Sequence, residues 1–172
     1  MAPFVARGLV VDLDGTLIDT EPLYYDAYAA VAAEFGKAYS FDVHRLLLGR
    51  AEIEGAGNWI EALGLGGGVT PHDVLARRDV HFLDAVRHVG ALPGALATLR
   101  AASAVMPVAI ATSSCRSYLP AKQANNADLF ACVAAVVCGD DAAVGGHSKP
   151  HPAIFEAGAA AIGVPPAACA AI

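Results

Sequence analysis

Two carboxylates stand two positions apart at the end of the first apolar run of the chain. Asp12 and Asp14 follow the apolar residues 8–11 and precede Gly15, which permits a sharp turn. Side chains two apart on a strand point to the same face, so both carboxylates can enter one pocket. Crowded carboxylates are costly unless a proton or a cation lies between them, and Mg²⁺ is the hard cation that oxygen ligands suit. An Asp-x-Asp pair alone is more typical of a capped loop, so its meaning depends on its surroundings.

The elements that must position this pair read as one strand, a helical insertion, and then alternating helices and strands. Residues 8–11 predict a buried strand because they form an uninterrupted apolar run that ends at a charge. Thr20 and Ser40 are expected to cap the first two helices of the insertion. Helices are predicted at 21–35, 41–48, 51–63, 71–86, 95–103 and 152–162, and strands at 107–111, 134–139 and from 169 onward.

This order of elements predicts an α/β fold with two parts. Residues 1–17 and 91–172 are expected to form a Rossmann-like parallel sheet core, and residues 18–90 an inserted all-helical cap. In such a sheet, ligands bind beyond the carboxyl ends of the strands, and Asp12 leaves the first strand at that end. The pair of aspartates is therefore a candidate active site.

The composition excludes several classes of protein. Of 172 residues, 56% are hydrophobic and 16% charged, so a folded core is expected. The net charge of −6 without a cluster of Lys or Arg argues against nucleic-acid binding. The four cysteines show no zinc-ligand spacing, and no apolar stretch reaches the ~20 residues of a membrane helix. A cytoplasmic protein with no membrane partner is expected.

Three segments together resemble the haloacid dehalogenase superfamily. VVDLDGTLIDTE at 10–21 is similar to its first motif, ATSS at 111–114 to its second, and SKPHPAIF at 148–155 to its third. The segments LIDTEPLY, KAYSFDVHRLLLGR, LPGA and VVCGDDAAVGGHSKPHPAIF resemble the pseudouridine-5'-phosphatase group more closely. The helical insertion stands where the family's smaller type of cap is inserted.

The resemblance implies a role for each motif residue. Asp12 would be the nucleophile that becomes an aspartyl-phosphate, and Asp14 the general acid and base. The Asp12 carboxylate and the Asp14 main-chain carbonyl would bind the magnesium ion, so both residues are predicted metal ligands. Thr112 and the Ser113 amide would hold phosphoryl oxygens, and Lys149 would neutralise charge on nucleophile and phosphate. From the residues alone, Lys149 could instead be a solvated loop lysine, and Thr112 a helix cap.

Other polar residues have two interpretations each. Arg50, in the cap, could reach the polar end of a substrate or lie on the surface. Asp140 and Asp141 follow a predicted strand, where a helix cap or a solvated turn is favoured over a direct catalytic role. Trp59 is expected to pack inside the cap rather than to stack on a base.

The resemblance implies a fourth, acidic motif and further strands that would follow Ile172. We therefore expect an incomplete sheet whose last strands are missing, a C-terminally truncated chain, and weak Mg²⁺ affinity. An exposed sheet edge of this kind favours a homodimer.

The function expected is a Mg²⁺-dependent hydrolase of a small phosphomonoester, such as a nucleoside or sugar phosphate. Two alternatives stay open at this point: a phosphomutase of the same superfamily, and a truncated phosphatase-like protein without turnover.

Overall fold

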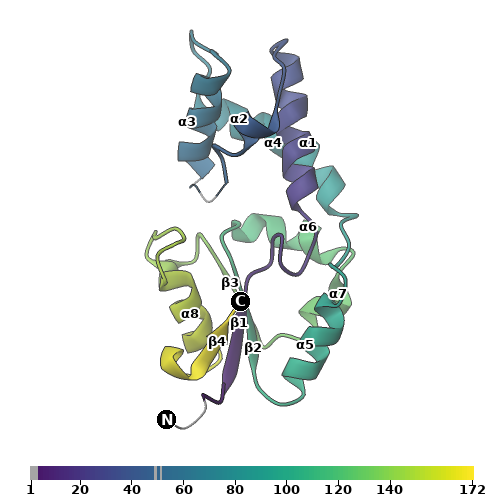
Figure 1. Ribbon diagram of the computed structural model, residues 1–172, viewed down its shortest axis with the longest axis vertical. Coiled ribbons are helices and arrows are strands. Elements are labelled where there is room, and N and C mark those ends of the chain that lie inside the picture. The colour runs from purple at the N-terminus through teal and green to yellow at the C-terminus, as the bar shows by residue number, and fades with distance from the viewer. Residues whose placement is uncertain (1–3, 49, 51) are drawn as a thin grey trace. The chain divides into compact units, whose positions relative to one another are not determined.

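The computed structural model describes residues 4–48, 50 and 52–172 (Figure 1). They fall into two compact units: the chain up to Asp19 together with Arg87–Ile172, and the continuous segment Thr20–Val86. These boundaries lie within a few residues of the predicted limits of core and cap. The assignment of the second unit as a cap over the site stays a prediction.

The first unit is built on a four-stranded parallel sheet. Its strands are β1 (Gly8–Val11), β2 (Val108–Thr112), β3 (Ala135–Cys138) and β4 (Cys169–Ala171), in the order β3-β2-β1-β4. The register pairs Leu9 with Val108 and with Ala170, so β1 has a partner on each side. Every residue of β1 and β2 is buried, as expected for strands that are covered on both faces. The predicted α/β parallel sheet is confirmed.

Helices lie on opposite sides of these strands, with α8 (Ala153–Ala161) on one side and α5 (Ala95–Ser103) on the other (Figure 1). Ile154 and Ala159 of α8 pack on Val10, Ala111 and Val137 of the sheet. The shorter helical segments of this unit are η1 (Arg116–Tyr118), α6 (Leu119–Gln123), α7 (Ala127–Phe130), η2 (Ala142–Val144) and η3 (Pro166–Ala168).

Gly158 allows α8 to approach β1 closely. A Cβ atom at this position would lie 2.6 Å from Cγ1 of Val10, well inside van der Waals contact. We therefore expect Gly158→Ala to lower the free energy of unfolding by about 1–3 kcal/mol, because overpacking forces helix and strand apart. Urea unfolding followed by far-UV circular dichroism measures this.

A matched control for that substitution exists in a helix with free space. Gly57 lies inside a helix of the second unit, and a Cβ atom there meets nothing within 4 Å. Gly57→Ala should stabilise by about 0.5–1 kcal/mol through the lower backbone entropy of alanine. Equal effects of the two substitutions would show that the approach of α8 to β1 is not tight.

The second unit is all-helical, as predicted, with α1 (Glu21–Glu34), α2 (Phe41–His44), α3 (Glu52–Ala62) and α4 (Pro71–Val86). Trp59 is fully buried in its core beside Tyr28, Val31 and Val74, so the prediction that it packs inside the cap is confirmed. Among the helices of the described residues, none is both long and apolar enough to cross a membrane.

Two details of the helical prediction were wrong. Thr20 has helical backbone angles (φ −87°, ψ −17°), whereas a capping side chain needs an extended backbone, so it makes no capping hydrogen bond. The second helix ends at His44 rather than Leu48, because the amides of Leu46 and Leu47 bond three residues back, in a tighter turn. Ser40 does cap this helix, accepting from the Val43 amide at 3.5 Å. The predicted start of the third helix, Ala51, lies outside the described residues.

Candidate active site

The carboxyl ends of the parallel strands bring distant segments of the chain together. Asp12 follows β1 directly, Thr112 is the last residue of β2, and Gly139 follows β3. Gly15 has a φ of +68°, and its amide donates to the carbonyl of Ile18 at 3.0 Å, so the chain after β1 turns sharply there. This left-handed conformation is available to glycine at little cost. The turn holds Asp12 and Asp14 at the end of the sheet.

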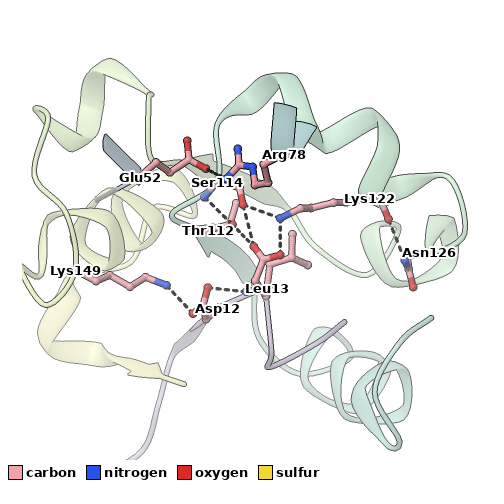
Figure 2. Close-up of polar contacts among 10 residues, drawn as sticks. Asp12, Leu13, Glu52, Arg78, Thr112, Ser114, Lys122, Asn126 and Lys149 are labelled. Carbon is pink, nitrogen blue, oxygen red and sulfur yellow. Dashed lines mark hydrogen bonds and ion pairs between the residues drawn. The ribbon is translucent and has the colours of Figure 1, made fainter. Parts of the chain in front are cut away.

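Asp12 is paired with Lys149. Its Oδ2 lies 2.6 Å from Nζ of Lys149, and its Oδ1 accepts a hydrogen bond from the Leu13 amide at 2.8 Å (Figure 2). The two side chains are about a quarter exposed, at 27% and 25%. The Lys149 ammonium also lies 5.3 Å from the centre of the Phe155 ring. Lys149 is therefore directed at the candidate nucleophile rather than being a solvated loop lysine.

Asp14 is held by a different set of groups. Its Oδ2 accepts hydrogen bonds from the hydroxyls of Thr112 at 2.9 Å and Ser114 at 3.0 Å. Its Oδ1 forms an ion pair with Nζ of Lys122, which also donates to Oγ of Ser114 at 2.6 Å. Repulsion between Asp12 and Asp14 is thus offset by one ammonium for each carboxylate. The sequence had suggested a single shared cation instead.

The structure gives the two predicted phosphate ligands of the second motif different surroundings. Thr112 is fully buried; its hydroxyl donates to Asp14 and accepts from the Ser114 amide at 3.1 Å. Ser113 is exposed, and its main chain lies tightly against Gly139, where a Cβ atom would come within 2.4 Å of the Ser113 carbonyl oxygen. Contacts of Thr112 and Ser113 with a phosphate stay predictions.

Arg50 belongs to the second unit and lies on its surface. Its guanidinium is 2.8 Å from Oε1 of Glu54, one helical turn away, and both side chains are about half exposed. A contact of Arg50 with substrate stays a prediction.

Asp140 and Asp141 stand in the turn after β3, where both carboxylates are bonded to Arg116. The Arg116 guanidinium binds both oxygens of Asp141, at 2.8 and 2.5 Å, and the Arg116 amide donates to Asp140 at 2.8 Å. The hydrogen bonds from the Arg116 guanidinium lower the pKa of the Asp141 carboxyl. Cys138 has a ligand atom within 4.8 Å of both aspartates, but burial raises the pKa of its thiol to about 11. A protonated thiol and engaged carboxylates make a poor metal site, which supports the interpretation as a turn.

Sequence reasoning missed two residues of the site, Ser114 and Lys122. Ser114 was noted only as part of the ATSS motif. Lys122 stands in the short helix α6, where a lysine ordinarily lies in solvent, yet its exposed fraction is 0%. Neither spacing nor periodicity indicates its contact with Asp14.

The family of the chain follows from comparison with known proteins. The family model described as haloacid dehalogenase-like hydrolase matches residues 6–172, nearly the whole chain. The chain belongs to this family. In this haloacid dehalogenase-like hydrolase, Asp12 and Thr112 lie at the carboxyl ends of β1 and β2, and Lys149 reaches Asp12 from the turn before α8.

This haloacid dehalogenase-like hydrolase is similar to two proteins named as phosphatases and to a solved structure of a family hydrolase. It is 32% identical over 158 residues to "Probable pseudouridine-5'-phosphatase" of Drosophila melanogaster, covering 91% of this chain and 68% of that protein. It is 29% identical over 152 residues to (DL)-glycerol-3-phosphatase 2 of Arabidopsis thaliana, covering 88% of this chain and 63% of that one. A crystal structure of a family hydrolase from Deinococcus radiodurans with bound phosphate and sodium superimposes with a TM-score of 0.71 at 26% identity, covering 96% and 71%. The chain thus spans about two thirds of the length of these relatives.

Proposed function

We propose that this chain provides the phosphoryl-transfer site of a hydrolase for small phosphomonoesters, which works through an aspartyl-phosphate on Asp12. The observation that carries the proposal is the partly exposed ion pair between Asp12 and Lys149 at the carboxyl end of β1. A dianionic phosphate approaches a carboxylate only where positive charge offsets their repulsion, and the Lys149 ammonium supplies such a charge.

The reaction would proceed in two steps. First, an Asp12 oxygen attacks phosphorus, the bond to the leaving oxygen breaks, and protonated Asp14 gives that oxygen its proton. Second, Asp14 accepts a proton from water as the water oxygen attacks phosphorus. The acyl-phosphate bond then breaks, releasing phosphate and regenerating the Asp12 carboxylate. Asp14 lies two residues beyond the nucleophile, and the hydroxyls of Thr112 and Ser114 hold its carboxylate. A group that acts in both steps needs such a fixed position.

The residues present are suited to Mg²⁺. The donor set consists of hard oxygen atoms, namely the Asp12 carboxylate and the main-chain carbonyl of Asp14, which is the ligand type this ion prefers. The Asp14 carboxylate is a poorer candidate, because three side-chain donors converge on its two oxygens and one of them is the fully buried ammonium of Lys122. When bound, the ion supplies positive charge to the phosphoryl oxygens.

Two of the relatives are named for small phosphorylated compounds, as a probable pseudouridine-5'-phosphatase and a glycerol-3-phosphatase. These names support small phosphorylated metabolites as the substrate class. A phosphomutase would share the first step and pass the phosphoryl group to a second substrate hydroxyl instead of water. Product analysis with a hexose 1-phosphate separates the two, since only a hydrolase releases inorganic phosphate. The cytoplasmic location and the homodimer through the sheet edge stay predictions.

The proposal predicts hydrolysis of p-nitrophenyl phosphate that depends on Mg²⁺. In excess Mg²⁺ the purified chain should release p-nitrophenol, and chelation with EDTA should lower the rate by about 10²-fold, because the metal contributes several kcal/mol of charge stabilisation. Adding Mg²⁺ back beyond the chelator should restore the rate. Turnover that resists EDTA would contradict the metal requirement, and no turnover in any condition would favour the non-catalytic alternative.

A further inference from the structure

Lys122 is a fully buried cation beside the candidate active site. Its ammonium contacts Oδ1 of Asp14 and Oγ of Ser114, from the opposite side of the site to Lys149 (Figure 2). Moving an ammonium out of water costs several kcal/mol, and a buried ion pair often stabilises a fold no better than packed apolar side chains would. Stability alone is therefore a weak explanation for a lysine at this position.

The backbone that carries Lys122 is itself anchored. The carbonyl of Lys122 accepts a hydrogen bond from Nδ2 of Asn126 at 2.9 Å, and the same amide group donates to the carbonyl of Val89 at 3.0 Å. Asn126 is buried as well. The end of α6 is thereby tied to the segment before α5. These bonds fix the main-chain position from which the Lys122 side chain extends toward Asp14.

The contacts of Asp14 select one orientation of its carboxylate. Three side-chain donors, from Thr112, Ser114 and Lys122, converge on its two oxygens. Ser114 is also bonded to Lys122, so that these groups form one connected network. Asp12, by contrast, is paired with Lys149 and receives an amide from Leu13. Each carboxylate has its own lysine.

We propose that Lys122 is a positioning residue for Asp14, holding its carboxylate in the orientation in which it takes a proton from the water that hydrolyses the aspartyl-phosphate. The inference rests on the proposed function. In this step the water oxygen bonds to phosphorus, the bond from phosphorus to Asp12 breaks, and the proton passes to Asp14. Lys149 serves the other partner, the Asp12 nucleophile. With a leaving group that needs no proton, Asp14 and hence Lys122 are required only for the hydrolysis of the intermediate.

Pre-steady-state kinetics with p-nitrophenyl phosphate separates these steps. Its leaving group departs without a proton, so formation of the aspartyl-phosphate does not need Asp14. This formation appears as a burst of p-nitrophenolate, and the slower hydrolysis of the intermediate sets the later rate. In Lys122→Met we expect a burst of unchanged rate, followed by a steady state that is about 10²-fold slower, the usual contribution of a positioned base. In the matched variant Lys149→Met the burst itself should slow.

A merely structural role of Lys122 would give a different pattern. Equal slowing of both phases in Lys122→Met, or slowing of neither, would overturn the proposal. If Lys122→Met does not fold by circular dichroism, Lys122→Leu, which also lacks a donor, is measured in the same way and is held to the same two outcomes.

The proposed function and this inference can fail separately. If the unmodified chain shows no turnover, the proposed function fails for this chain. Crystal structures of the chain and of Lys122→Met then decide the positioning role. An Asp14 carboxylate that leaves Thr112 and Ser114 in the variant supports it, and one that keeps both hydrogen bonds overturns it.

Discussion

Asp12→Asn is expected to lower the turnover of p-nitrophenyl phosphate by about 10⁴-fold or more, as loss of a nucleophile does in other covalent mechanisms. An amide oxygen is a poor nucleophile toward phosphorus, and the amide cannot form the negative charge that pairs with Lys149. The size and shape of the side chain are almost unchanged, and its oxygen can still accept from the Leu13 amide. Loss of activity with an unchanged circular dichroism spectrum would therefore be chemical in origin.

A carboxylate elsewhere in the same unit gives the control for this variant. Asp128 pairs with Arg100 at 3.2 Å on the surface, with a side chain that is 76% exposed. Asp128→Asn should leave turnover unchanged, because a surface ion pair contributes little. If Asp12→Asn kept more than about a tenth of the wild-type rate, the nucleophile would have to be another residue, because removing an essential group lowers the rate by more than that.

Lys149→Met is expected to lower kcat/KM by about 10²–10³-fold, the usual cost of removing one preorganised group that stabilises developing charge. Methionine occupies a similar volume without the ammonium, so the Asp12 carboxylate and an incoming phosphate would repel each other. The losses should appear in KM as well as kcat, because the charge acts on the bound phosphate and on the transferring phosphoryl group. Steady-state kinetics in excess Mg²⁺ measures both.

Lys37 offers the matched control for that substitution. It is an exposed lysine of the second unit. Lys37→Met should retain the wild-type kinetics. Wild-type kcat/KM in Lys149→Met would mean that its ion pair with Asp12 is only structural, and the proposed function would lose the observation on which it depends.

Most of the fold was predictable because its strands are continuous apolar runs. The segments 8–11 and 107–111 correspond to β1 (Gly8–Val11) and β2 (Val108–Thr112). Because both faces of the sheet are covered, these strands are apolar throughout and show no alternation of polar and apolar residues. Helix ends were harder to place, since they depend on local backbone angles. Thr20 shows this: it has the residue type of a cap but not the extended conformation that capping requires.

The site was predictable where chemistry follows strand ends, and unpredictable where it depends on side-chain packing. Asp12 and Lys149 were predicted because they stand in the first and third motifs, and the structure places their charged groups in contact. The contact of Lys122 with Asp14 has no signature in the sequence, because lysines in short helices mostly face water. The buried hydroxyl of Thr112 could not be foreseen either, since its direction is set by Asp14 and Ser114.

The central place of β1 in the strand order has a consequence for synthesis on the ribosome. β1 is made early, but its neighbours β2 and β4 begin about a hundred or more residues later in the chain. Closing so long a loop costs chain entropy before any pairing offsets it. The helical segment Thr20–Val86 is continuous and can fold as soon as it emerges. The strand that directly precedes the candidate nucleophile is therefore an unpaired apolar segment while the helical segment folds, which makes this interval the vulnerable stage in the biogenesis of the protein.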